Sequence, residues 1–322
     1  GARRGHDVRG KSMTALDWIT NGLVAAAVIA VSAIFWLPGI RSSRLWRAAL
    51  TPLASIIGSG FLVVAPLLAH TVGNAALFAM LGIVALAYAV GSAVRYNICH
   101  VEAISEPGEG GDDALPLYVW LERLAKLALA FAYIIAITFY LEILGAFVLR
   151  LFEVQNQDAQ KLIATALLVF IGSFGFWRGL RQLESLEKYS VHTKLAIIAG
   201  FLVGLAIVNI DDVVTHTWRL AEMNVEWNSE TLRKLLGAFL IVQGFETSRY
   251  LGAAYSAEER VTTMRYAQLL SAAIYIVFVG LASILFGSLG TISETGIISL
   301  SSQVAVIVPF LLISADEEWL TA

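Results

Sequence analysis

Long apolar runs separated by short polar connections occupy most of this chain. A bilayer core about 30 Å thick takes roughly 20 predominantly apolar residues of helix, and runs of that length with few charges recur along the sequence. The pattern therefore predicts membrane-spanning helices rather than the half-polar helices of a water-soluble domain. The expected spans lie at 17–39, 50–70, 73–95, 122–150, 160–178, 191–210, 232–256, 267–288 and 296–315.

Composition supports the same class. Of 322 residues, 58% are hydrophobic and 15% are charged, and the mean hydropathy is +0.74, whereas a soluble domain is about 45–50% apolar and about 25% charged. The net charge of −3 gives no support for a nucleic-acid partner. With Cys99 the only cysteine and no HExxH pattern among the histidines, we expect no metal, no cofactor and no enzymatic activity.

The positive charges predict an orientation, because Lys and Arg accumulate in cytoplasmic connections. Basic residues cluster at 41–47, 95–126, 178–194 and 249–265, and the alternate connections are poorer in them. We therefore expect these four clusters in the cytoplasm of a polytopic protein of a bacterial inner membrane. The first apolar run is followed by basic residues and lacks a small-residue cleavage pattern, so no cleaved signal peptide is expected.

Both ends of the sequence suggest that it is part of a longer protein. It begins at Gly1 and its first methionine is Met13, so residues 1–12 are expected to be a basic leader or a tag remnant. At the other end the chain stops soon after an apolar run. Residues 13–48 are expected to form one extra N-terminal transmembrane helix and its linker.

The run at 50–70 contains an unusual sequence, IIGSGF, from Ile56 to Phe61. A glycine costs about 1 kcal/mol relative to alanine inside a helix, so Gly58 and Gly60 favour local unwinding around Ser59. Unwound backbone in mid-membrane is tolerated only where protein or a wet cavity surrounds it. The alternative is close helix packing, which small residues also permit.

A second polar interruption lies in the run at 232–256, at Gln243, Gly244 and Glu246. A carboxylate far inside an apolar run is expensive and is a functional candidate by default. Interruptions at corresponding positions of two halves of a chain are the best sequence indication of a transporter site between inverted repeats. The pair therefore favours a binding site where the two broken helices meet.

The residues around both interruptions resemble the amino acid–polyamine–organocation (APC) superfamily. Residues 51–69, TPLASIIGSGFLVVAPLLA, are similar to the first core helix of that family. Residues 237–267 resemble its sixth helix and the following loop, where GFE is followed by Glu258, Glu259 and Arg265. The segment PGEGGDDALPLYVW (107–120) is similar to the family's element before the third helix.

The resemblance implies an all-α integral membrane protein with a LeuT-type inverted-repeat bundle, in which core helices 1 and 6 are discontinuous. Residues 49–210 would form the first five-helix repeat, 211–231 an extracytoplasmic connection, and 232–322 a second repeat. That repeat would hold only three helices, because the fold normally has at least ten and the chain supplies eight. Arg249, just inside the second break, also departs from the family pattern.

The implied function is secondary active transport of amino acids, related amines or organic solutes, coupled to protons and working by alternating access. In the third core helix, Tyr133 and Tyr140 share a face and are expected either to line the site or to pack. Phe239 is the expected gate. The expected substrate-binding residues at the breaks are Ile57, Gly58, Ser59, Gly60, Phe61, Gln243, Gly244, Phe245 and Glu246.

Two further residues are candidates for ion coupling. Proton-coupled members of the family carry a lysine on the fifth helix where sodium-coupled relatives hold an ion, and Lys194 stands in such a context. Its alternative role is a lysine that snorkels to the interface. Glu142 is a carboxylate within the third core helix, which makes it a candidate by default.

A second class of function fits the same sequence. A transporter-like membrane domain can act as a sensor or regulatory module without moving a solute. The partners expected in either case are the lipid bilayer and a small molecule, with protons added for a transporter; no oligomeric state is predicted. The acidic stretch from Glu102 to Asp113 is expected to be a solvated loop.

Overall fold

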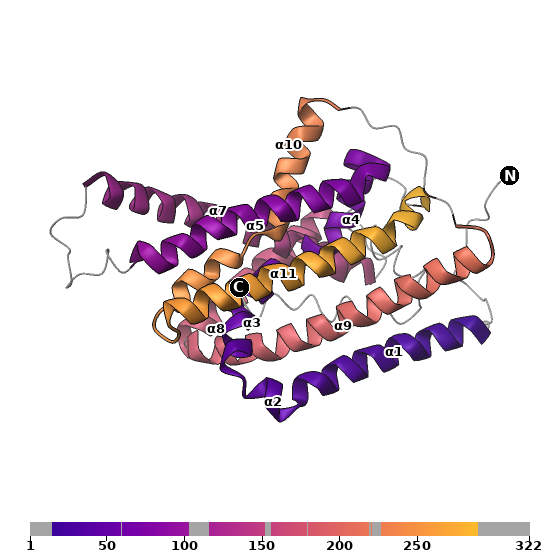
Figure 1. The fold of residues 1–322 in the computed structure, drawn as a ribbon, viewed down its shortest axis with the longest axis horizontal. Coiled ribbons are helices and arrows are strands. Elements are labelled where there is room, and N and C mark those ends of the chain that lie inside the picture. The colour runs from indigo at the N-terminus through magenta and orange to yellow at the C-terminus, as the bar shows by residue number, and fades with distance from the viewer. Residues whose placement is uncertain are drawn as a thin grey trace.

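The computed structural model describes residues 15–58, 60–102, 116–151, 156–178, 180–218, 220 and 227–288, and every regular element in this part is helical. Figure 1 shows α1, α5, α9 and α11 lying roughly along one common direction, with the short α10 standing across them. The elements, with η for 3-10 helices, are α1 (Ala15–Trp36), α2 (Pro38–Arg41), α3 (Arg44–Ile56), α4 (Gly60–Val72), η1 (Gly73–Ala75), α5 (Ala76–His100), α7 (Pro116–Leu151), α8 (Gln157–Arg178), α9 (Leu180–Val214), α10 (Ser229–Ala238), η2 (Phe239–Val242), η3 (Phe245–Leu251), α11 (Ala257–Ala282) and η4 (Ser283–Ser288).

Five stretches of the described chain are long and apolar enough to cross a membrane. This confirms an all-α integral membrane protein. The span expected at 160–178 is helical as α8, but α8 is not among the five, and its membrane crossing stays a prediction. The span expected at 296–315 lies outside the described residues. The five stretches are Trp18–Trp36, Gly60–His100, Trp120–Ala146, Ser190–Val214 and Ala257–Phe286.

Several helices extend beyond the apolar runs that predicted them. α9 starts at Leu180 rather than near 191, and α11 starts at Ala257 rather than near 267. The start of α11 is fixed by a capping box, in which the Ser256 hydroxyl accepts from the Glu259 N–H and the Glu259 carboxylate accepts from the Ser256 N–H. The hydropathy pattern does not predict such polar helix ends, because it indicates only the length of helix that lipid covers.

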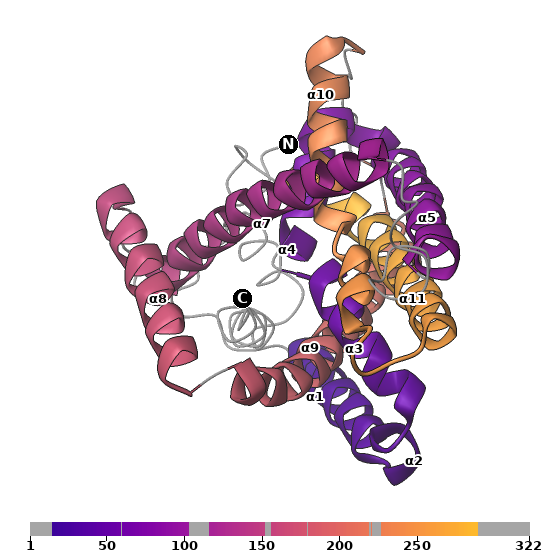
Figure 2. The same cartoon turned by 90° about the vertical axis from the view of Figure 1, so that its left-hand side faces the viewer.

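The extra N-terminal helix, α1, lies alongside α9 (Figures 1 and 2). Gly200 of α9 permits this approach, because a methyl group there would meet a Val28 methyl of α1 at 2.5 Å. α11 packs against both α3 and α5, and α7 packs against α8. Figure 2 shows α8 at the edge of the bundle far from α5 and α11.

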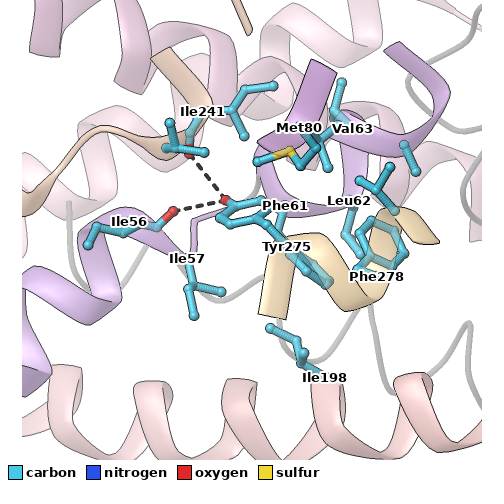
Figure 3. Packing of buried hydrophobic residues seen from close by; sticks show 14 of the residues in the cluster. Ile56, Ile57, Phe61, Leu62, Val63, Met80, Ile198, Ile241, Tyr275 and Phe278 are labelled. Atoms are coloured by element: carbon cyan, nitrogen blue, oxygen red, sulfur yellow. Dashed lines mark hydrogen bonds between the residues drawn. The ribbon is translucent and has the colours of Figure 1, made fainter. Parts of the chain in front are cut away.

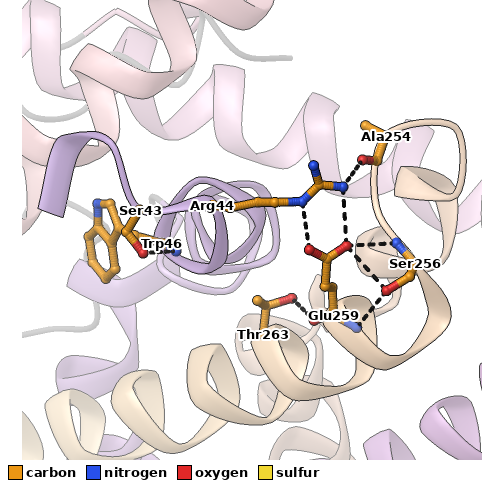
Figure 4. Close-up of polar contacts among 7 residues, drawn as sticks. All are labelled: Ser43, Arg44, Trp46, Ala254, Ser256, Glu259 and Thr263. Carbon is orange, nitrogen blue, oxygen red and sulfur yellow. Dashed lines mark hydrogen bonds and ion pairs between the residues drawn. The ribbon is translucent and has the colours of Figure 1, made fainter. Parts of the chain in front are cut away.

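Ends that the charge pattern predicts in the cytoplasm meet at one end of the bundle, at the left in Figure 1. There the Arg44 guanidinium, at the start of α3, forms an ion pair with Glu259 of α11 at 2.6 Å. Arg44 also donates to the Ala254 carbonyl oxygen at 3.1 Å, as Figure 4 shows. The pair holds the beginning of α3 to the beginning of α11.

Candidate functional site

The first broken helix is α3 and α4. α3 ends at Ile56, and the next residue, Ile57, has φ −92° and ψ 66°, which is not helical. The chain becomes helical again at Gly60, where α4 begins. The Phe61 N–H donates a hydrogen bond to the Gly58 carbonyl oxygen at 3.0 Å. Each half has 13 residues and is about 20 Å long, so neither half spans a bilayer alone.

The second broken helix runs from α10 through η2 to η3. It is interrupted at Gln243, which is extended with ψ 178°, and at Gly244, which has φ 111°. A positive φ favours glycine, because other residues place their Cβ against the backbone there. The interruption therefore lies at the sequence Gln243–Gly244, where the polar residues predict it.

The two breaks touch one another. A methyl group at Gly244 would lie 2.5 Å from the carbonyl carbon of Ser55, in the last turn of α3. One at Gly60 would lie 3.0 Å from Ile241 Cγ2. The glycines therefore do two things, since they permit the unwound backbone and let the two unwound segments come into contact.

Tyr275 of α11 connects the two breaks, as Figure 3 shows. Its hydroxyl donates to the Ile56 carbonyl oxygen at 2.9 Å and to the Ile241 carbonyl oxygen at 3.1 Å. The side chain is fully buried, with an exposure of 0%. Its ring lies against those of Phe61 and, beyond it, Phe278, in the apolar core. A single hydroxyl thus satisfies carbonyls at both helix interruptions.

The carboxylate of Glu246 folds back onto its own break. One oxygen accepts from the Gly244 N–H at 2.9 Å, and the other accepts from the Tyr133 hydroxyl of α7 at 2.9 Å. Thr247 adds a hydrogen bond from its hydroxyl to the Gly244 carbonyl at 2.6 Å. The structure thereby brings Tyr133 of α7 to the second break. Its role in lining a site stays a prediction.

Two other polar side chains lie at or beside the second break. Gln243 is half-buried. Ser248, in η3, is fully buried, and within the described chain its hydroxyl has no hydrogen-bond partner. A buried hydroxyl without a partner costs about 1–3 kcal/mol, so Ser248 is a candidate donor to a bound molecule that sequence reasoning did not single out.

The apolar candidates occupy different environments. Ile57, Phe61 and Phe245 are buried in the core, and Phe61 packs against aromatic rings rather than lining an opening. Phe239, the expected gate, is the half-buried first residue of η2. Gly58 is buried beside the break, and Ser59 lies outside the described residues.

The remaining candidates lie away from the contact between the breaks. Tyr140 is half-buried about two turns beyond Tyr133. Position 142 is on the opposite side of α7 from Tyr133, and the Glu142 carbonyl accepts a hydrogen bond from Gln160 of α8 at 3.0 Å. Lys194 of α9 is buried, with 7% exposure. The roles of these residues stay predictions.

Sequence reasoning also missed a polar face on α11. Gln268, Ser271 and Tyr275 are all buried, and their spacing of three and four residues places them on one helix face. Gln268 accepts from the buried Arg95 of α5 and donates to the Ala87 carbonyl at 3.0 Å. Polar residues at this spacing inside the apolar run at 267–288 were the signal that could have revealed them.

Glu102, expected in a solvated loop, is instead half-buried and paired. It accepts from Arg249 of η3 at 3.2 Å and from Arg260 of α11 at 2.8 Å. Arg249 also pairs with Glu122 of α7 at 2.9 Å. The unusual Arg249 therefore joins η3 to α7 and to the segment just after α5, and Glu102 continues this network to α11. The rest of the acidic stretch lies outside the described residues.

The fold and the two touching helix breaks define a polytopic, all-helical membrane protein with an interrupted-helix site. A family model described as APC superfamily transporter matches residues 38–317. The chain therefore belongs to the APC superfamily of transporters. It is also similar to a protein of Aquifex aeolicus (strain VF5) that carries only the name "uncharacterized protein", with 43% identity over 296 residues, covering 91% of this chain and 71% of that protein. No solved structure matches the chain.

Proposed function

We propose that this protein is a proton-coupled secondary transporter of amino acids or related small amines and organic solutes, located in a bacterial inner membrane. The observation that carries the proposal is the contact between two interrupted helices, at Ser55–Gly244 and through Tyr275. Broken helices that meet in mid-membrane present backbone N–H and C=O groups to a solute where lipid cannot reach them.

In this proposal the binding site lies beside the breaks, with backbone groups of residues 57–61 on one side and Gln243–Glu246 on the other. Tyr133 holds the Glu246 carboxylate in place at 2.9 Å, and Ser248 offers an unused hydroxyl. An amine fits this site better than a second anion, since Glu246 is the acidic group at the break. Residues 49–210 and 232–322 are the two inverted repeats, and Phe239 is the gate.

The proposed mechanism is alternating access. α3 and η3 meet α11 at the end expected in the cytoplasm. There Arg44 of α3 pairs with Glu259 of α11, and Glu102 pairs with both Arg249 of η3 and Arg260 of α11. Separation of these ion pairs would open the site toward the cytoplasm, while movement of α4 and α10 would open it to the outside. The half-helices can move in this way because unwound backbone at each break acts as a hinge.

Lys194 is the proposed proton carrier. It is buried on α9 with 7% exposure, and α9 packs against α3. The lysine on the fifth helix of proton-coupled APC transporters, which Lys194 resembles in its sequence context, supports this role.

The test is uptake by the full-length protein in proteoliposomes, with an imposed pH gradient and a panel of radiolabelled amino acids, amines and organic acids. We expect accumulation of at least one compound that a protonophore abolishes. Lys194→Ala should abolish accumulation and leave counterflow exchange intact, whereas Lys161→Ala, at an exposed position on α8, should behave like the wild type. Unchanged gradient-driven uptake by Lys194→Ala would dismiss the coupling role, and no uptake of any compound would favour a sensor.

A further inference from the structure

The carbonyl groups freed at a pair of broken helices are a ready coordination site for a cation. In this protein two of them, Ile56 O and Ile241 O, converge on one point, although they belong to helices far apart in the sequence. That point is occupied by the hydroxyl of Tyr275, at 2.9 Å from the first oxygen and 3.1 Å from the second. The hydroxyl hydrogen carries the partial positive charge that both oxygens need.

We propose that the Tyr275 hydroxyl takes the place of a bound metal cation between the two broken helices, so that this junction is held without sodium. Tyr275 is then a positioning residue, which fixes the Ile56 and Ile241 carbonyls relative to each other. One consequence of the proposal rests on the proposed transport function: no sodium ion would couple transport at this junction.

The surroundings of the hydroxyl argue against a metal ion there. Figure 3 shows apolar side chains packed around Tyr275, among them Met80 and Phe278. The polar residues that line a cavity with Tyr275 include the neutral Gln268 and Ser271. Among the described residues, the fully buried polar and charged set contains no Asp or Glu. The acid at the second break, Glu246, is half-buried, and its two oxygens already accept from Tyr133 and from the Gly244 N–H, so it is not a free ligand for a cation at Tyr275.

A fixed positive charge nearby also disfavours a bound cation. Arg95 is 6% exposed and bonds to Gln268, which precedes Tyr275 by about two turns on α11. A buried guanidinium raises the electrostatic potential around it and opposes the entry of another cation. A neutral hydroxyl satisfies the two carbonyls without adding charge.

The cavity that Tyr275 helps to line is also small. Val84, Tyr88, Gln268, Ser271 and Tyr275 are among the residues that line a space of about 10 Å³. Such a volume is about that of one water-sized sphere. It has no room for a hydrated ion or for an extra side chain.

Hydrogen–deuterium exchange of the purified full-length protein in nanodiscs tests the proposal without any substrate. We compare the wild type, Tyr275→Phe and the control Tyr266→Phe, whose tyrosine is 60% exposed on the same helix. Tyr275→Phe should speed exchange about tenfold in the segments 53–61 and 239–247 together, and leave α9 unchanged. Tyr266→Phe should change neither segment.

The same measurement on the wild type in sodium chloride and in choline chloride needs no variant, so it decides even if Tyr275→Phe does not fold. We expect equal exchange in the two salts. Slower exchange at both breaks in sodium would overturn the proposal, as would a Tyr275→Phe protein in which only one break, or neither, is loosened. Because no transported solute is present, failure here is separate from failure of the uptake experiment.

Discussion

Tyr133 donates a hydrogen bond of 2.9 Å to the carboxylate of Glu246, across a sequence separation of 113 residues. The same carboxylate accepts from the Gly244 N–H at 2.9 Å. One acidic side chain therefore connects α7 to a helix break and supplies an acceptor for a backbone N–H that the break leaves without a helical partner. The geometry makes Glu246 a structural part of the break as well as a candidate ligand.

The effects of removing Tyr133 or Glu246 on the free energy of unfolding should not be additive. We expect Tyr133→Phe and Glu246→Gln each to lower stability, and the double variant to lose about 1–2 kcal/mol less than the sum of the two. The measurement is a double-mutant cycle of unfolding free energies in mixed micelles. Strict additivity would mean that the hydrogen bond does not contribute to the folded state in the membrane.

Gly244 should not tolerate a side chain. Gly244→Ala places a Cβ at φ 111° and 2.5 Å from the Ser55 carbonyl carbon, so we expect a loss of at least about 2 kcal/mol. Gly237→Ala is the matched control, since nothing lies within 4 Å of a Cβ there and alanine favours the helix α10. Thermal unfolding of both variants checks the prediction. A Gly244→Ala protein as stable as the wild type would contradict it.

Gly91 makes room for the buried Gln268 amide. Gly91→Ala would drive a methyl group into that amide and displace it from Arg95 and the Ala87 carbonyl, at a cost of about 1–3 kcal/mol. Gly82→Ala on the same helix meets no atom within 4 Å and should be neutral or slightly stabilising. Thermal stability in nanodiscs distinguishes the two, and equal stability of both variants would show that Gln268 can move aside.

Loss of the ion pairs of Arg249 should lower the stability more than loss of the exposed Lys126–Glu122 pair. Arg249→Ala leaves the half-buried Glu102 and Glu122 with fewer partners, so we expect a loss of about 1–3 kcal/mol. Lys126→Ala, which removes a cation that is 58% exposed and pairs with Glu122, should cost less than about 0.5 kcal/mol. Chemical unfolding at two salt concentrations checks this ranking. A larger effect for Lys126→Ala would contradict the assignment.

Local patterns were enough to place the two breaks. Closely spaced glycines and polar residues inside an apolar run weaken a helix locally, so IIGSGF and QGFE indicated the interruptions at Ile57–Gly58 and Gln243–Gly244. Polar helix ends were not predictable in the same way, because lipid does not cover them and hydropathy reports only what lipid covers. The α9 and α11 starts were missed for that reason.

Contacts between distant residues needed the tertiary structure. Tyr275 resembled any aromatic residue in an apolar run, and only the packing of α11 between the broken helices gave its hydroxyl two acceptors. Its partners are 34 and 219 residues away in sequence, and no local periodicity encodes such a meeting. Glu102 was likewise read as a solvated acid, because its partners Arg249 and Arg260 come from elements that follow it by more than 140 residues.

The sequence by itself determined that this is a helical membrane protein with two interrupted helices, because apolar length and glycine placement act within one helix. The tertiary structure decided what those interruptions do. It set Gly244 against Ser55, Tyr133 against Glu246 and Tyr275 between the two free carbonyls, since the direction in which each broken helix presents its backbone depends on how its neighbours pack around it.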